Sequence, residues 1–296
     1  MKSLKILFMA LLGITLITAC DDDDNSSGNG NLNLNISGLE DLGADYIYEG
    51  WIIVDGQALT TGTFRVDAGG KLSQSSFSLD REDLENSSAF VLTIEPFPDS
   101  DPAPSKVHIL AGDISSGKAT LSVDHGAALG TDFTSAMGKY ILATPTDGMN
   151  NNENSGVWFL DPSSGAPAAG LSLPALPEGW IYEGWAVIDG QPVTTGKFSS
   201  VSAADNAAPF SGSQQGPPFP GEDFVENAPD GLIFPTDLAG GKAVISVEPV
   251  PDNSEAPFLL KPLLGDIPQD AADHTVYSLA NIAGDTNPAG SVNISL

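Results

Sequence analysis

One stretch of the chain occurs twice, and this repeat constrains the fold more than any other feature. The first copy, YEGWIIVDGQALTTGTF, spans 48–64, and the second, YEGWAVIDGQPVTTGKF, spans 182–198. Of the 17 aligned positions 11 are identical, and the copies start 134 residues apart (182 − 48 = 134). In each copy an apolar run leads through Asp-Gly into a Thr-rich run. Because Asp-Gly accepts the positive φ angles of a type I′ turn, each copy predicts a β-hairpin.

Short strand-like segments surround both hairpins. Residues 31–37 alternate polar and apolar side chains, and 89–95 form a run that Pro96 ends. Segments rich in Gly, Pro, Asn and Asp separate these runs, and helical periodicity is missing over any useful length. The pattern favours an all-β fold of β-sandwich type, immunoglobulin-like or Greek-key.

Later motifs recur as well, which extends the duplication beyond the hairpins. The Glu-Pro pair at 95–96 returns at 248–249, an offset of 153 residues (248 − 95 = 153). The second copy therefore holds about 19 additional residues, which fall in Ser199–Pro220. We predict two tandem β-sandwich domains, at 31–160 and 171–296, joined by a Pro-, Gly- and Ser-rich linker at 161–170.

The amino terminus has the features of a secretory signal. A positively charged start precedes the apolar run 6–17, which is too short to span a membrane. The run ends in Leu-Ile-Thr-Ala-Cys at 16–20, which resembles the lipobox of bacterial lipoproteins. The resemblance implies that 1–19 is a signal peptide and that Cys20 carries lipid. The alternative is an ordinary signal peptide with an incidental cysteine.

Residues 20–30 predict a flexible tether, because an acidic run and Asn, Ser and Gly cannot bury apolar area. The acidic run at 21–24 also resembles the signal that exports lipoproteins to the outer surface of some Gram-negative bacteria. We expect a lipid anchor in the outer membrane of the bacterial cell envelope, with display on the cell surface. Display on the periplasmic side is the alternative.

The charge of the chain limits its partners. The sequence has 39 acidic and 11 basic residues, a net charge of −28 at pH 7. Removal of 1–19 takes away Lys2 and Lys5, which leaves 9 basic residues (11 − 2 = 9). No basic patch remains for phosphates, so we expect no nucleic-acid binding. Since Cys20 is the only cysteine, the mature chain has no disulfide and no Cys-ligated metal.

The second copy resembles a known family. The run LSLPALPEGWIYEGWAVIDGQPVTTGKF at 171–198, with Ser-Val-Glu-Pro at 246–249 and Ala-Pro at 256–257, is similar to the extracytoplasmic carboxy-terminal domain of anti-sigma-K factors. The likeness covers most of 171–270 and, more loosely, 34–115. It implies an exported β-domain. Those regulators also have a cytoplasmic sigma-binding segment and a transmembrane helix, and because this chain has neither, the resemblance does not imply sigma-factor sequestration.

The sequence does not single out a catalytic constellation. His108, His125 and His274 are far apart and lack the His-x-x-x-His spacing of metal hydrolases. A Gly-x-Ser-x-Gly elbow and a phosphate-binding loop are both missing, and no pair of carboxylates stands out. We expect a protein that is not an enzyme, with no catalytic residues and no cofactor.

The tryptophans of the hairpins, Trp51 and Trp185, allow two interpretations. Each follows a glycine, so we expect a core tryptophan over a glycine gap; a sugar-stacking platform is the alternative. Glu49 and Glu183 share a strand face with these tryptophans. We expect both to be exposed or bonded to the backbone.

Glu95 and Glu248 each precede a proline at the end of a predicted strand, and we interpret them as strand-end caps.

Two loops are candidate binding sites. Oxygen ligands of the kind that Ca²⁺ takes cluster at Asp147, Asn150, Asn152 and Glu153, although the spacing is not that of an EF-hand. We expect an acidic hairpin loop there, with calcium as the alternative. In the insertion Ser199–Pro220, which we expect to be a long mobile loop, Phe210 and Phe219 are candidates for partner contact, with a disordered insertion as the alternative.

The sequence supports three functional hypotheses. The leading one is a lipid-anchored, non-enzymatic interaction or structural module, attached to the membrane through its lipid and binding an envelope protein or a glycan. The alternatives are an envelope signalling component that modulates a sigma/anti-sigma system and a glycan-binding surface lipoprotein.

Overall fold

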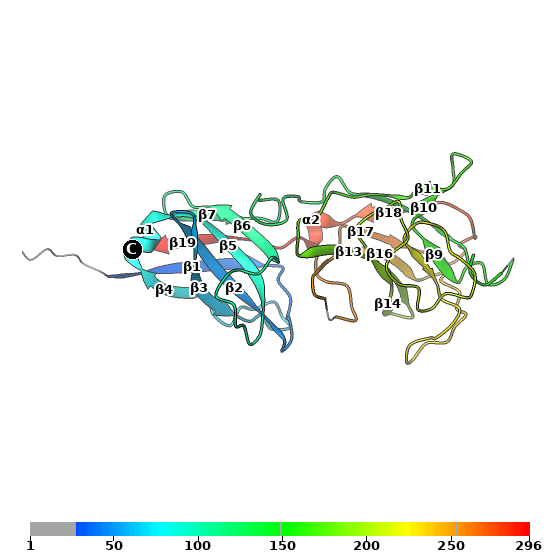
Figure 1. Ribbon diagram of the computed structural model, residues 1–296, viewed down its shortest axis with the longest axis horizontal. Helices are drawn as coiled ribbons and strands as arrows, with labels where there is room; N and C mark the ends of the chain where they lie inside the picture. The colour runs from blue at the N-terminus through cyan, green and yellow to red at the C-terminus, as the bar shows by residue number, and fades with distance from the viewer. Residues whose placement is uncertain (1–27, 149, 253) are drawn as a thin grey trace, which may run out of the picture.

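The computed structural model describes residues 28–148, 150–252 and 254–296 (Figure 1). The predicted signal peptide, Cys20 and most of the predicted tether therefore lie outside the described residues. The last two tether residues, Asn29 and Gly30, already pair with a neighbouring strand, so the sheet begins earlier than predicted. Neither helix of the described chain has the length and apolar character that crossing a membrane requires.

The described chain is nearly all β, as the sequence predicts. Its strands pair antiparallel throughout, and two short helices interrupt them, α1 (Arg81–Asn86) and α2 (Ala283–Thr286). The side chain of Asp80 caps the start of α1 by accepting a hydrogen bond from the Glu82 amide.

Eight strands form two four-stranded sheets that face each other, which we call the first sandwich (Figure 1). The strands are β1 (Asn29–Ser37), β2 (Tyr46–Val54), β3 (Gln57–Phe64), β4 (Ser76–Asp80), β5 (Ser87–Pro96), β6 (His108–Asp113), β7 (Lys118–Leu121) and β19 (Ala289–Ser295). Their orders are β4-β1-β19-β7 and β3-β2-β5-β6. In β1 the apolar residues Leu32, Leu34 and Ile36 are buried and alternate with less buried asparagines, which is the period of two that the sequence shows.

Nine strands form one larger sheet, which we call the second sheet, and it follows the first sandwich along the long axis (Figure 1). They are β8 (Met137–Leu142), β9 (Gly156–Trp158), β12 (Leu171–Ser172), β13 (Trp180–Ile188), β14 (Gln191–Phe198), β15 (Gly221–Asp223), β16 (Lys242–Pro249), β17 (Leu263–Asp266) and β18 (Tyr277–Asn281). The order is β14-β13-β16-β17-β18-β8-β9-β15, and β12 pairs with β8. One continuous cluster of buried apolar side chains draws members from the first sandwich and from the second sheet.

The two predicted hairpins form with the same register. Tyr48 pairs with Phe64 in β2–β3, and Tyr182 pairs with Phe198 in β13–β14. The pairing shifts by one residue directly after the glycine that precedes each tryptophan, so both hairpins carry a β-bulge at the same place. Both residues of each Asp-Gly turn have positive φ, which confirms the turn prediction.

The sheets do not follow the predicted division at 161–170. The last strand, β19, was assigned to the second copy, but it pairs with β1 across the whole of 31–37. Strands β8 and β9, expected to close the first copy, belong to the second sheet, where Tyr140 pairs with Tyr277. The predicted linker itself contributes to a small hairpin, β10 (Leu160–Asp161) with β11 (Ala168–Ala169). The repeat shows only that two segments of the sequence are similar. It does not show which strands pair, and these pairings join segments far apart in the chain.

Candidate functional site

Each hairpin tryptophan is buried, but on the face of the sheet that points away from the main core. Trp51 is 3% exposed and Trp185 is 2% exposed, so neither offers an open ring face for a sugar. The space left by the missing side chain of each glycine is filled by the ring of a phenylalanine. A Cβ on Gly50 would lie 2.9 Å from the Phe90 ring, and one on Gly184 would lie 2.7 Å from a core phenylalanine, Phe159. The prediction that both tryptophans are buried is confirmed, but the space at each glycine receives a phenylalanine ring.

A buried chain of hydrogen bonds links the first tryptophan to a loop. Trp51 Nε1 donates to Thr93 Oγ1 at 2.9 Å, and the Thr93 hydroxyl donates to the Glu95 carboxylate. The same carboxylate accepts the Ser105 backbone N–H at 2.9 and 3.1 Å. Glu95 thus fixes the far end of the loop that follows β5, which agrees with the prediction of a strand-end cap.

The second copy repeats this chain of hydrogen bonds. Trp185 Nε1 donates to Ser246 Oγ at 2.8 Å, and the Ser246 hydroxyl donates to Glu248. Glu248 accepts the Phe258 backbone N–H at 3.0 Å, ten residues along the chain, the same spacing as in the first copy. The hydroxyl residue two positions before each glutamate is a sequence signal that could have identified the pattern, because i and i+2 share a strand face.

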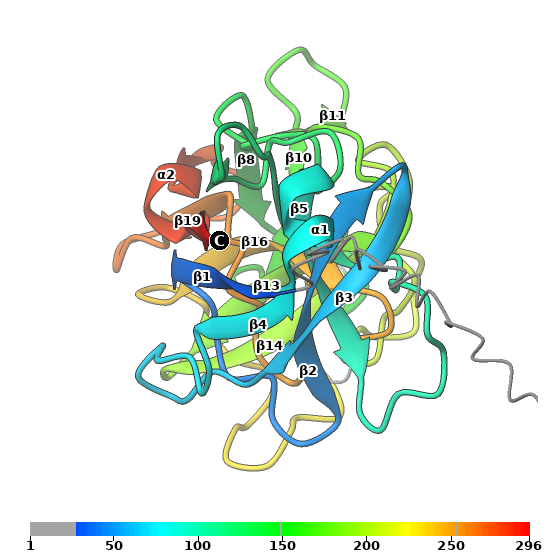
Figure 2. The ribbon, with the colours of Figure 1, turned by 90° about the vertical axis from the view of Figure 1, so that its left-hand side faces the viewer.

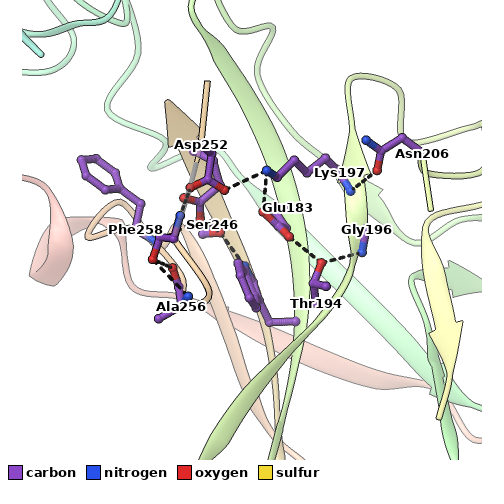
Figure 3. Close-up of polar contacts among 12 residues, drawn as sticks. Glu183, Thr194, Gly196, Lys197, Asn206, Ser246, Asp252, Ala256 and Phe258 are labelled. Atoms are coloured by element: carbon purple, nitrogen blue, oxygen red, sulfur yellow. Dashed lines mark hydrogen bonds and ion pairs between the residues drawn. The ribbon is translucent and has the colours of Figure 1, made fainter. Parts of the chain in front are cut away.

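The second copy adds charged groups around its hairpin (Figure 3). Glu183 is 3% exposed and accepts a hydrogen bond from the Thr194 hydroxyl, whereas its counterpart Glu49 is half-buried and bonded to Thr60. The expectation of an exposed or backbone-bonded glutamate is therefore wrong, because the cross-strand threonine supplies the partner.

A lysine completes this arrangement in the second copy alone. Lys197 Nζ lies 2.9 Å from Asp252 Oδ2 and 3.9 Å from Glu183 Oε2. Lys197 pairs with Glu183 across the hairpin, and the equivalent position of the first hairpin is Thr63. We call Glu183, Lys197 and Asp252 the Lys197 cluster.

Burial dominates the electrostatics of this region. It raises the pKa of Glu183 to about 7, although Thr194 and Lys197 act in the opposite direction. It also raises the pKa of Glu248 to about 8. Burial alone would lower the pKa of Lys197, but the hydrogen bond to Asp252 and the charge of Glu183 outweigh it and raise that pKa. Both glutamates can therefore hold protons near neutral pH while the lysine stays charged in its ion pair.

A cavity of about 950 Å³ opens beside the second hairpin. Glu183, Trp185 and Lys197 line one side, and Phe210 with the loop Ser254–Ala256 lines the other. The cavity combines carboxyl groups, an ammonium group and aromatic surface, which suits hydrogen-bonded recognition of a polar or basic group.

The insertion Ser199–Pro220 folds back onto the sheet. Phe219 is 9% exposed and packs in a cluster with Trp158. Phe210 contacts the Phe224 ring at a centroid distance of 5.9 Å and the Phe234 ring at 5.6 Å. The predicted partner contacts are therefore turned inward, because these rings gain more by covering apolar surface than by facing water.

Polar contacts also hold this insertion. Asp205 accepts the Gly221 N–H at 2.9 Å, and Asn206 exchanges hydrogen bonds with the backbone of Lys197. On β15, Asp223 accepts hydrogen bonds from Trp158 Nε1 at 2.8 Å and from the Thr146 N–H at 2.7 Å. The long mobile loop of the prediction is a structured insertion, anchored by acids whose partners lie too far away in sequence to be recognised.

The candidate calcium residues are only partly brought together. Asp147 accepts a hydrogen bond from Asn152 Nδ2 at 2.6 Å, and Glu153 accepts one from the Thr144 N–H at 3.4 Å. Asn150 is exposed. Across the described ranges, no group of three or more His, Cys, Asp or Glu side chains could hold a metal ion. Calcium binding stays a prediction.

The histidines contact three different groups, as their spacing suggested. His108 Nδ1 lies 2.9 Å from the Ala127 carbonyl oxygen, and His125 Nε2 lies 3.3 Å from Asp113. His274 lies beside Asp273.

No known protein family, curated protein or solved structure matches this chain. The resemblance to anti-sigma-K factors stays a prediction from the quoted motifs.

Proposed function

We propose that this protein is a lipid-anchored, non-enzymatic module of the bacterial cell envelope that holds a binding surface away from the membrane. The observation that carries the proposal is the position of the first and last described strands. Strands β1 and β19 are neighbours, and both lie at the end of the molecule opposite the second sheet (Figures 1 and 2).

The length of the tether defines the distance from the anchor. The first strand residue, Asn29, lies nine positions after Cys20 (29 − 20 = 9). A fully extended chain of that length reaches at most about 30 Å. A lipid on Cys20 would therefore keep the first sandwich near the membrane and direct the second sheet outward.

The connection between the two parts suits a rigid spacer. The chain passes from the first sandwich to the second sheet after β7 and returns before β19, so two segments join them. The continuous apolar core crosses the same junction. The cavity beside the second hairpin is thus carried on the second sheet, and its loop residue Ser254 also lies near the first sandwich.

We infer a protein partner with a basic surface. The cavity beside the second hairpin has exposed acids on its rim, Asp230 and Glu255, and the chain has a net charge of −28. Charge complementarity speeds association and weakens with added salt.

Anchoring is tested by fractionating cells that express the full chain or Cys20→Ala. The variant is expected to leave the membrane fraction, and its unchanged retention would contradict the lipid anchor. Presentation is tested by in-cell photocrosslinking from Glu255, with Asp101 in the corresponding loop of the first sandwich as the matched control. Adducts are expected from Glu255 and not from Asp101, and to decrease as salt rises. Equal adducts from both positions would contradict a partner site at this cavity.

A further inference from the structure

The Lys197 cluster places an amine against two carboxyl groups (Figure 3). Lys197 Nζ lies 2.9 Å from Asp252 Oδ2 and 3.9 Å from Glu183 Oε2. The Asp252 side chain is 4% exposed and that of Lys197 is 28% exposed, so little water reaches the carboxyl group. The amino group and the carboxyl group that it would attack are therefore held in contact, with the carboxyl group buried and the lysine beside an open cavity.

Glu183 is oriented toward this pair. The Gly196 N–H donates to Thr194 Oγ1 at 2.9 Å, which directs the threonine proton to Glu183 Oε1. The other oxygen, Oε2, accepts no hydrogen bond from the described residues and lies 3.9 Å from Lys197 Nζ, and the Glu183 carboxyl also interacts with that of Asp252. A buried acceptor without a donor is costly, so this orientation needs an explanation.

We propose that Lys197 and Asp252 form an intramolecular isopeptide bond, with Glu183 carrying the proton that the reaction moves. In the starting ion pair, the Lys197 ammonium gives one proton to the Asp252 carboxylate, which leaves an amine and a carboxylic acid. The amine nitrogen attacks Asp252 Cγ. Glu183 takes a proton from that nitrogen and delivers one to a departing oxygen, which leaves as water. The new Nζ–Cγ amide and one water molecule account for every atom, and Glu183 returns to its starting state.

Proximity and exclusion of water favour this step. Well-oriented groups inside one molecule react as if at about 10⁵–10⁸ M, and a dry site suppresses the reverse hydrolysis. Burial raises the pKa of Glu183 to about 7, so the group can both hold and release a proton at neutral pH. Because each molecule forms only one such bond, the reaction needs to occur once and can be slow.

The first hairpin supplies an internal control. Glu49 and Asp99 occupy the positions of Glu183 and Asp252, but Thr63 stands where the second hairpin has Lys197. Without an amine the first copy cannot form this bond. The cross-link is therefore specific to the second copy.

The test is tryptic peptide mapping of the full chain purified from cells and denatured before digestion. Without the bond, trypsin cuts after Lys197 and Lys242 and releases 140–197 and 198–242. With the bond, Lys197 resists cleavage, and 140–242 remains joined to 243–296, lighter by one water than the two peptides together. Fragmentation of this species is expected to show two amino-terminal sequences, beginning at Tyr140 and Ala243, which excludes a missed cleavage.

Variants assign the roles. Lys197→Arg keeps the positive charge beside Asp252 but cannot form this amide, so digestion after residue 197 is expected to be complete. Asp252→Ala is expected to release 140–197. Glu183→Gln is expected to slow linkage by about 10²-fold or more. Quantitative recovery of separate 140–197 and 198–242 from the unmodified chain would overturn the proposal. Linkage of Glu183→Gln at the normal rate would overturn the role given to Glu183.

Discussion

Replacement of Glu248 by glutamine isolates the energetic effect of one buried acid. Glu248 is fully buried, and its Oε1 accepts hydrogen bonds from the Ser246 hydroxyl and the Phe258 N–H. Glutamine has the same shape and retains an oxygen acceptor, but it does not ionise. The variant therefore removes a titration while it preserves the packing around Trp185.

The direction of the effect follows from the direction of the pKa shift. In the unfolded chain the Glu248 carboxyl ionises near its usual pKa of 4.5, whereas burial raises its pKa in the folded protein to about 8. Between these two values the folded protein holds a proton that the unfolded chain has released. The stabilising contribution is complete below pH 4.5 and is lost as the pH rises to about 8. Each pH unit of this window corresponds to about 1.4 kcal/mol, so the loss is about 5 kcal/mol in all.

The assay is urea unfolding followed by tryptophan fluorescence at several pH values from 5 to 9. Four other acids have pKa values that burial raises to about 7, so the unmodified protein has a steeper pH dependence than Glu248 alone would cause; they are Glu40, Glu183, Asp205 and Glu222. The unfolding free energy of Glu248→Gln is expected to fall by a few kcal/mol less than that of the unmodified protein as the pH rises from 5 to 9. Glu255→Gln, at an exposed position of the same loop, is the control. Parallel curves for the unmodified protein and Glu248→Gln would refute the reasoning.

Two packing predictions use matched controls. Gly184→Ala is expected to destabilise the protein by about 1–3 kcal/mol, because the new methyl group meets Phe159, whereas Gly126→Ala has open space and is expected to be nearly neutral; chemical denaturation of both variants measures the difference. Phe219→Ala is expected to cost about 3–5 kcal/mol, because the ring is 9% exposed. Phe97→Ala, where the ring is 52% exposed, is expected to cost under about 1 kcal/mol. Equal melting temperatures for the two phenylalanine variants would contradict an inward-facing insertion.

The hairpins could be predicted from sequence because every feature that defines them is local. The Asp-Gly turn, the alternating run and the Thr-rich return strand lie within 17 residues. The all-β class was predictable for the same reason. The place of β19 was not, since its partner β1 lies at the opposite end of the chain and any strand with the same alternation would present the same face.

The candidate site was only half predictable. Glu95 and Glu248 were recognised as strand-end caps, because the proline after each ends the strand. The donors that reach them, Ser105 and Phe258, depend on how a Pro-rich loop turns back. Phe219 was misjudged because a Gly- and Pro-rich insertion resembles a mobile loop unless its buried contacts are known.

Comparison of the two copies separates architecture from specialisation. Both copies have the bulged hairpin, the buried tryptophan and the glutamate that holds a loop, so these features maintain the sheet. A threonine in the first copy corresponds to Lys197 in the second. In the second copy alone, the insertion Ser199–Pro220 folds back onto the hairpin strand that carries Lys197. Architecture alone would not require these additions, since the first hairpin folds without them. The second copy is therefore where we expect the activity of the protein to lie, and a lysine-to-carboxyl bond would strengthen it by joining the loop of Asp252 to the hairpin.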